Sequence, residues 1–230
     1  MPAASTRLRL LAALVIASLT VTGCQTLDDA GRAIGHSDLV NDLANRLDQA
    51  LTLTYSADYQ LAAGQTASIA QAQEPARSAY TWPGGRLTVT EEATTRCGTS
   101  GGRTVCTLEP PPATTAKPSV AMFAEAKRQG LVTPPVVVGL LTAAALDPDA
   151  LITSSDTTLA GRHASCVEVR GSANDFSACV TTEGALGSFT GQVDGAPVDL
   201  ALTRYRETVD STAFDLPPGA GVVDRRPAGS

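Results

Sequence analysis

The sequence has 230 residues, with 17 basic and 23 acidic side chains, so its formal net charge is −6. A negative surface repels nucleic acid and anionic lipid headgroups, which disfavours both as partners. The length suits one domain with its own hydrophobic core.

The first 24 residues have the pattern of an export signal. Arg7 and Arg9 form a basic start, residues 10–19 form an apolar run, and the sequence Val21-Thr22-Gly23-Cys24 follows. This ending resembles the lipobox of bacterial lipoproteins, which implies that residues 1–23 are removed and that Cys24 is acylated. The apolar run is too short to cross a bilayer of roughly 30 Å. We therefore expect a mature chain held by its lipid on the extracytoplasmic face of the cell membrane.

The region after the signal changes from a tether to a helix and then to strands. Residues 24–36 are polar and contain glycine, which predicts a flexible tether. A helix is predicted from Ser37 to Ala50 because its apolar residues recur at helical spacing. From Leu51 to Leu61 apolar and polar residues alternate, which predicts a half-buried strand. A second strand follows from Gln65 to Glu74.

Glycine-containing turns predict the pairing of two later hairpins. A two-residue turn at Gly84-Gly85 would place Trp82 opposite Leu87 and Tyr80 opposite Val89. A turn at Asp194-Gly195 would place three pairs opposite each other, namely Phe189 with Leu200, Gly191 with Val198 and Gly187 with Leu202. These pairs would put the large apolar side chains of each hairpin on one face.

The same reasoning pairs four of the five cysteines. A turn at Gly101-Gly102 places Cys97 opposite Cys106, and a loop over residues 171–174 places Cys166 opposite Cys179. In a cytosolic protein Cys97, Cys106, His163 and Cys166 could be argued as zinc ligands. In an oxidising exported compartment two cross-strand disulfides are the better interpretation, and we expect no metal site.

Two helices are predicted in the middle of the chain, after a stiff link that contains Pro110, Pro111 and Pro112. The first covers Ser119 to Gln129, and the second begins with Thr133 as N-cap and Pro134 at the first helical position and ends at Leu146. The second helix has no polar face, so we expect it to be buried all round.

The remaining chain is predicted to form strands, about ten in all with those before the helices. Residues 147–155 are expected to be a loop, and strands resume at about Thr157. A last short strand is predicted at Thr212–Leu216, and residues 224–230 are expected to be a disordered tail.

The usual catalytic motifs are missing from the sequence. It has no G-x-S-x-G, H-E-x-x-H or C-x-x-C motif and no glycine-rich phosphate loop, and its histidines are His36 and His163. We therefore expect neither an enzyme nor a cofactor. A hydrolase with an unfamiliar site is a remaining alternative.

The order of these elements is similar to that of a known family. A helix, antiparallel strands, a two-helix insert, further strands, the lipobox and the closing run from Ala213 to Ala220 together resemble the LolA/LppX/LprG superfamily of exported lipid-binding proteins. The resemblance covers residues 37–223. It implies an α+β fold with a strongly curved antiparallel sheet of about 10–11 strands, an unclosed half-barrel whose concave face is covered by the N-terminal helix and the inserted helices. It also implies that the concave face holds lipid tails and carries them across the envelope.

On this basis we expect a lipid or other amphiphile to bind non-covalently in an apolar cavity between the sheet and the inserted helices. Six residues are expected to line this cavity: Trp82, Phe123, Val137, Leu140, Leu141 and Leu200. The alternative is an envelope sensor or docking module that has a closed core and recognises a protein partner.

Overall fold

The computed structural model describes residues 38–112, 120–171 and 175–227. The chain divides into two compact units, Met1–Leu39 and Val40–Ser230, and the elements below belong to the second. The export signal, Cys24 and the predicted tether lie outside the described residues.

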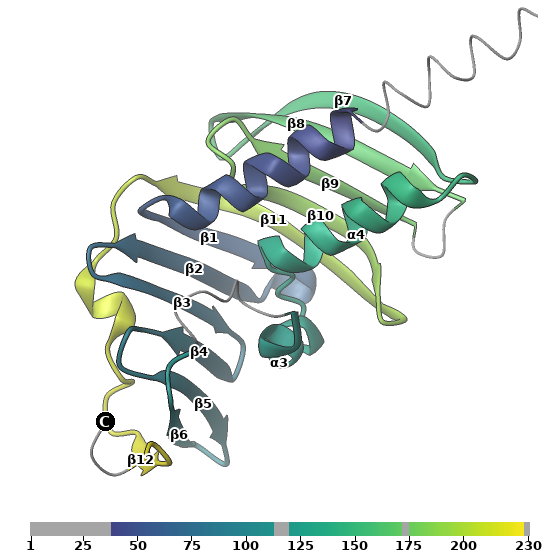
Figure 1. Ribbon diagram of the computed structural model, residues 1–230. Coiled ribbons are helices and arrows are strands. Elements are labelled where there is room, and N and C mark those ends of the chain that lie inside the picture. Colours follow the sequence, from purple (N-terminus) through teal and green to yellow (C-terminus); the bar gives the residue numbers. More distant parts are fainter. Residues whose placement is uncertain (1–37, 113–119, 172–174, 228–230) are drawn as a thin grey trace, which may run out of the picture. The chain divides into compact units, whose positions relative to one another are not determined.

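The described residues form twelve strands in a single sheet (Figure 1). Along the chain these strands are β1 (Tyr55–Leu61), β2 (Thr66–Gln73), β3 (Ala76–Trp82), β4 (Gly85–Val89), β5 (Thr94–Ser100), β6 (Arg103–Glu109), β7 (Leu151–Leu159), β8 (Arg162–Arg170), β9 (Phe176–Thr181), β10 (Leu186–Val193), β11 (Ala196–Arg206) and β12 (Gly221–Asp224). Their order in the sheet is β12-β6-β5-β4-β3-β2-β1-β11-β10-β9-β8-β7. Pairing of β1 with β11 joins the two halves of the chain. All neighbours are antiparallel except β12 and β6, and the edges β12 and β7 leave the sheet unclosed.

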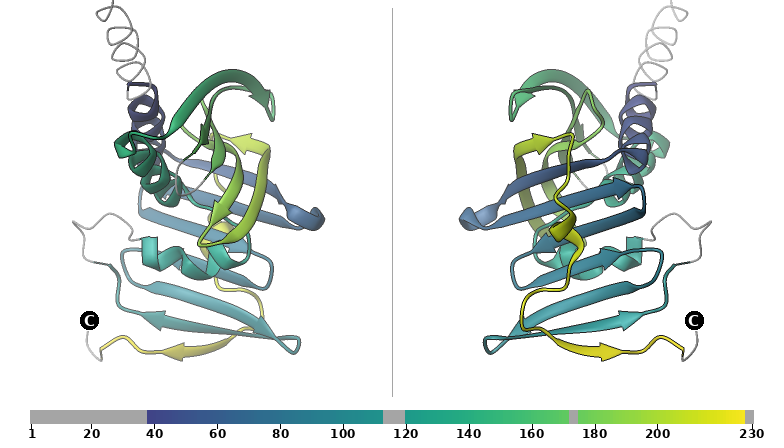
Figure 2. Two further views of the ribbon diagram at one scale, coloured as in Figure 1. Left: turned by 90° about the vertical axis from the view of Figure 1, so that its right-hand side faces the viewer. Right: turned by 90° about the vertical axis from the view of Figure 1, so that its left-hand side faces the viewer.

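Helical segments precede β1 and lie at three places between strands. A helix ends at residue 49, and its side chains Val40, Leu43 and Leu47 are fully buried. The short turns η1 (Ala50–Thr52), η2 (Ala62–Gly64) and η4 (Ser211–Phe214) are 3-10 helices, and the insert contains η3 (Val120–Phe123), α3 (Ala124–Arg128) and α4 (Pro134–Leu146). In both views of Figure 2, α4 lies beside the helix that ends at residue 49. Among the described residues, no helix is long and apolar enough to span a membrane.

Three hairpins have the predicted pairing. Cys97 lies opposite Cys106 and Cys166 opposite Cys179, and both pairs form disulfides in the structure. In the β10–β11 hairpin, Phe189 lies opposite Leu200 and Gly191 opposite Val198, as the Asp194-Gly195 turn predicts.

The predicted pairing of β3 with β4 is wrong by two residues. Trp82 lies opposite Gly85 and Tyr80 opposite Leu87, so the turn is Pro83-Gly84, with Gly84 in the left-handed region at φ +78°. Gly85 belongs to the strand, where it is the partner of Trp82. A Cβ atom on Gly85 would lie 2.4 Å from Nε1 of Trp82, so the glycine makes room for the indole.

Several predicted boundaries also need correction. β1 begins at Tyr55 and not at Leu51, because residues 50–52 form η1. β7 begins at Leu151, inside the predicted loop. The strand predicted at Thr212–Leu216 is instead the turn η4, because the carboxylate of Asp210 accepts a hydrogen bond from the N–H of Thr212 at 2.9 Å and caps a helical turn. The last strand is β12, and Arg225 beyond it donates its N–H to the carbonyl of Leu108 at 2.8 Å.

The helix α4 has the predicted start but not the predicted burial. Its N-cap is Thr133 and proline occupies the first helical positions. Five of its residues are buried, namely Pro134, Val136, Val137, Leu141 and Ala144, whereas Gly139, Thr142, Ala143 and Leu146 are exposed, the last to 79%. The expectation of burial all round is therefore wrong. Most of the exposed positions carry small side chains, so solvent contact there costs little free energy.

Candidate functional site

Strand pairing places one row of side chains across the middle of the sheet. From β1 to β6 this row consists of Ala57, Ile69, Tyr80, Leu87, Arg96 and Thr107. Because residues directly opposite each other project to the same face, all six lie on one side of the sheet.

The residues Val120–Arg128, which form η3 and α3 and are called the crossing helix below, lie on this face. Phe123 is 1% exposed and packs edge-on against Tyr80, with the ring centroids 4.7 Å apart. Nη1 of Arg96 donates to the carbonyl oxygen of Met122 at 3.1 Å, which fixes one end of the crossing helix to β5. At the other end Lys127 forms an ion pair with Asp194 in the β10–β11 turn. The crossing helix thus spans the sheet from β5 towards the β10–β11 hairpin.

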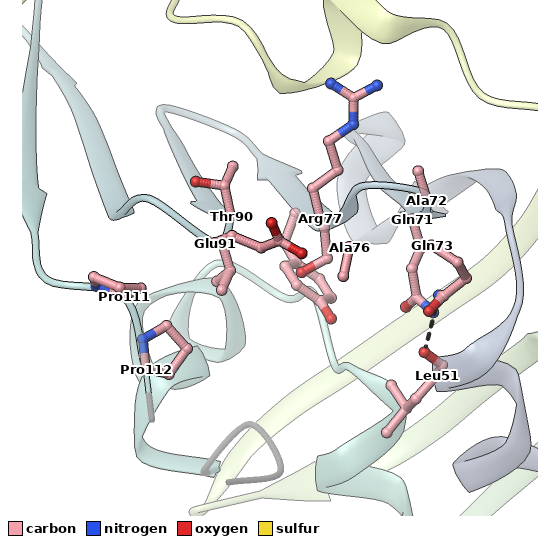
Figure 3. A pocket seen from close by; sticks show the side chains of 13 residues that line it. Leu51, Gln71, Ala72, Gln73, Ala76, Arg77, Thr90, Glu91, Pro111 and Pro112 are labelled. Atoms are coloured by element: carbon pink, nitrogen blue, oxygen red, sulfur yellow. Dashed lines mark hydrogen bonds between the residues drawn. The ribbon is translucent and has the colours of Figure 1, made fainter. Parts of the chain in front are cut away.

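A pocket of about 400 Å³ lies at the end of β2, β3 and β4, and is called the β2–β4 pocket below (Figure 3). Its lining comes from five separate stretches of the chain: Leu51; Gln71, Ala72 and Gln73; Ala76, Arg77, Ser78 and Tyr80; Val89, Thr90 and Glu91; Pro111 and Pro112. The lining is mixed, with aliphatic and aromatic groups beside amides and one carboxylate. Such a pocket can hold a molecule that has an apolar part and a polar part.

Two glutamines fix one wall of the β2–β4 pocket. Nε2 of Gln71 donates to the carbonyl oxygens of Ala50 at 3.0 Å and Leu53 at 3.1 Å. Nε2 of Gln73 donates to the carbonyl oxygens of Leu51 at 3.2 Å and Leu53 at 3.0 Å. These bonds hold residues 50–53 against β2 and place Leu51 at the pocket. The wall is therefore ordered before any ligand arrives, which lowers the entropic cost of binding.

The charge at the pocket comes from Glu91, because Arg77 turns away. Figure 3 shows the guanidinium of Arg77 pointing away from the pocket, and its Cζ lies 4.3 Å from the ring centroid of Phe214. Burial raises the pKa of the Tyr80 hydroxyl to about 12, so Tyr80 is a neutral phenol at physiological pH. The pocket thus presents a neutral interior and one anionic group.

A second hollow, of about 760 Å³, borders the crossing helix and is called the Trp82 groove below. Glu125 and Gln129 line it, as does Trp82, which is itself 7% exposed. The crossing helix therefore borders the Trp82 groove. Its Phe123 also packs on Tyr80, and Tyr80 lines the β2–β4 pocket.

The six residues predicted to line a cavity are not gathered in either hollow. Trp82 lines the Trp82 groove, and Phe123 contacts Tyr80. Val137, Leu141 and Leu200 are almost completely buried, and Leu140 is half-buried. A cavity lined by all six residues stays a prediction.

Sequence reasoning missed the polar lining of the β2–β4 pocket, namely Gln71, Gln73 and Glu91. One signal was present in the sequence. The prolines at 110–112 predict a rigid, extended segment without backbone donors at those positions, and Pro111 and Pro112 form part of the pocket wall.

The comparisons with known proteins assign no family. No family model matches the sequence, and neither does any curated protein. Among solved structures, the chain is similar to MucB with a TM-score of 0.48, 14% identity, and coverage of 80% of this chain and 65% of that one. It is also similar to the MucA/MucB complex of Pseudomonas aeruginosa, with a TM-score of 0.46, 14% identity, and coverage of 80% and 63%. An uncharacterized conserved protein from Thermus thermophilus gives a TM-score of 0.45 and 12% identity, with coverage of 80% and 98%. The chain spans less than two thirds of the MucB chains that it matches.

Proposed function

We propose that this protein is an exported lipoprotein, anchored through acylated Cys24 on the extracytoplasmic face of the membrane, that binds a lipid or other amphiphile without covalent chemistry. In this proposal the sheet is a strongly curved half-barrel of the LolA type, and the N-terminal helix and the insert cover its concave face. The protein would act as a carrier or chaperone for its ligand in the cell envelope.

The β2–β4 pocket is the observation that carries the proposal. Its volume of about 400 Å³ lies in the range of roughly 300–1,000 Å³ that is usual for small-molecule sites. Leu51, Ala72, Val89 and Tyr80 provide apolar surface for a hydrocarbon part, and Gln73 and Glu91 provide polar groups. An amphiphile can satisfy both sets at once, whereas a fully polar ligand would leave the apolar surface unused.

Binding without chemistry agrees with the groups that line the pocket. Glu91 is its carboxylate among the described residues, and no histidine, cysteine or lysine lines it. General acid–base catalysis needs a base within hydrogen-bond reach of a nucleophile or a second acid. The described lining also holds the hydroxyls of Ser78, Tyr80 and Thr90, and that of Thr90 donates to the carbonyl oxygen of Ala93 at 3.3 Å.

The substitution Ala76→Trp tests the proposal. Ala76 is an exposed residue of the pocket lining, so an indole there should fill much of the volume without disturbing the core. Full-length chain purified from its own host should carry a lipid or amphiphile in native mass spectrometry, and the A76W chain should carry at least tenfold less. Thr81→Trp is the matched control, because Thr81 is an exposed residue of the same strand that does not line the pocket.

Two results would count against lipid binding. The first is a clean ligand-free mass for the unsubstituted chain, and the second is equal ligand content in the A76W and T81W chains.

One observation favours the alternative of a protein-docking module with a closed core. Val137, Leu141 and Leu200 are packed to 1% exposure or less, so the interior beneath α4 is filled there.

A further inference from the structure

Within the described part of the chain, the strand β7 forms one edge of the sheet and pairs only with β8, on its other side. It is nine residues long and keeps a regular register with β8 from Leu151 to Leu159, with no bulge. Proteins usually protect a long edge strand with lysine, proline or a bulge, because its free N–H and C=O groups can pair with another strand. β7 has none of these and carries one charge, Asp156. An unprotected edge of this length is a surface for strand pairing.

We propose that β7 pairs with β7 of a second copy of this chain, antiparallel, about a two-fold axis that passes through Ser155. Ser155 is the central residue of the strand, so this register alone lets all nine residues of each copy find a partner. It places Leu151 opposite Leu159, Thr153 opposite Thr157, and Ser154 opposite Asp156 of the other copy. The contact is isologous and therefore closed, giving a dimer and not a filament.

The apolar residues of β7 favour this register. Leu151 is 68% exposed, and Leu159 packs on a small cluster formed by Ala164, Cys166 and Cys179. Pairing through Ser155 brings the exposed Leu151 of each copy beside Leu159 of the other and so extends this cluster. Leu151 and Leu159 also share a face of the strand, because they are separated by an even number of residues.

The charges exclude the register centred on Asp156. A two-fold axis through Asp156 would place the two Asp156 carboxylates directly opposite each other, where like charges are destabilising. An axis through Ser155 puts each Asp156 opposite an uncharged residue, Ser154 of the other copy, instead. Asp156 also lies 3.8 Å from Nε2 of His163 on β8, so its charge has a neighbour within its own chain.

The direction in which the backbone N–H and C=O groups of β7 point is compatible with the same axis. The Cα atoms of Cys166 and Cys179 are 3.9 Å apart, which is the close spacing of a pair that does not exchange backbone hydrogen bonds. The N–H and C=O of Cys166 therefore point towards β7, where Ser155 is its partner. Along β7 the backbone groups alternate in direction, so those of Ser154 and Asp156 point to the free edge. An axis through Ser155 makes these two residues exchange hydrogen bonds and leaves the two Ser155 residues in the closely spaced type of pair.

Cysteine cross-linking of the full-length chain in detergent tests this register. Ser155→Cys should give a covalent dimer under mild oxidation, because the two residues face each other at close spacing. Thr153→Cys should give at least tenfold less, because its partner is Thr157 and not itself, and the double variant T153C/T157C should restore the dimer. The unsubstituted chain is the control for any cross-link through Cys24. The proposal fails if S155C gives no more dimer than T153C, or if S155C cross-links in the cell to a different polypeptide.

A substitution that removes one free donor provides a second measurement. The N–H of Ser154 points to the free edge and not to β8, so Ser154→Pro should leave the fold intact while it weakens pairing. We expect its dissociation constant for dimerisation, measured by analytical ultracentrifugation in detergent, to rise at least tenfold, and that of Ser154→Ala to stay unchanged. Equal dissociation constants for S154P, S154A and the unsubstituted chain would overturn the proposal.

Discussion

Replacing Phe123 with alanine should lower the free energy of unfolding by about 3–5 kcal/mol, the usual cost of removing a fully buried phenylalanine side chain. Phe123 is 1% exposed, and its ring meets Tyr80 at 4.7 Å in an edge-on contact. The alanine variant loses both the buried area and the aromatic contact, and it leaves a cavity beside Tyr80. Urea denaturation followed by circular dichroism gives the difference directly.

Phe214→Ala is the matched control for this prediction. Phe214 lies in η4, is only partly buried, and carries the guanidinium of Arg77 over its ring. Its loss should cost about 1 kcal/mol, the size of a partly solvated cation–π contact. If the two variants lose equal stability, the contact of Phe123 with Tyr80 does not hold the crossing helix on the sheet.

The hairpins show which parts of the fold follow from local sequence. Gly101-Gly102 and Asp194-Gly195 are turns whose residues readily adopt positive φ, and the strand pairing that they predict is present. The same reasoning failed at Gly84-Gly85, because it left out Pro83: proline followed by a glycine at positive φ is typical of a type II turn, and the turn is Pro83-Gly84. Gly85, which follows this turn, is the cross-strand partner of Trp82, and its lack of a side chain leaves room for the indole. Local turn chemistry therefore predicts a register only when every residue that can open the turn, here Pro83, is taken into account.

The sequence also does not show which face of α4 is buried. Its sequence, from Pro134 to Leu146, is apolar on every side, so no polar stripe marks the face that meets solvent. The helix start was predictable because proline at the first helical position is a local signal. The face that packs is chosen by the rest of the fold.

The β2–β4 pocket lay beyond sequence reasoning because no single segment encodes it. Leu51 lies at the pocket because the amides of Gln71 and Gln73 donate to carbonyl oxygens of residues 50, 51 and 53. Pro111 and Glu91 join them from segments that are distant in the chain. Each residue alone is typical of an exposed strand or loop, so no local sequence pattern indicates that these residues come together.

High pH should unfold this protein through its buried tyrosines. Burial raises the pKa of Tyr80 to about 12 from an ordinary value of 10.0, and burial also raises the pKa values of Tyr55 and Tyr59. Each phenol therefore loses its proton at a higher pH in the folded state than in the unfolded chain. The contribution of this pKa difference to the free energy of unfolding is fully present below pH 10. It is lost as the pH rises from 10 to beyond 12. Since one pKa unit corresponds to about 1.4 kcal/mol, Tyr80 alone accounts for a loss of about 3 kcal/mol.

The variant Tyr80→Phe isolates this contribution, because phenylalanine keeps the ring against Phe123 and has no proton to lose. Urea denaturation curves measured below pH 10 and at pH 12, each after brief exposure to protect the disulfides, give the change in unfolding free energy for both chains. The unsubstituted chain should lose about 2 kcal/mol more than Y80F over this interval, because half of the folded chains still keep the Tyr80 proton at pH 12. Equal losses in the two chains would mean that the Tyr80 hydroxyl reaches solvent, and the β2–β4 pocket beside it would then have a hydrated interior instead of an apolar one.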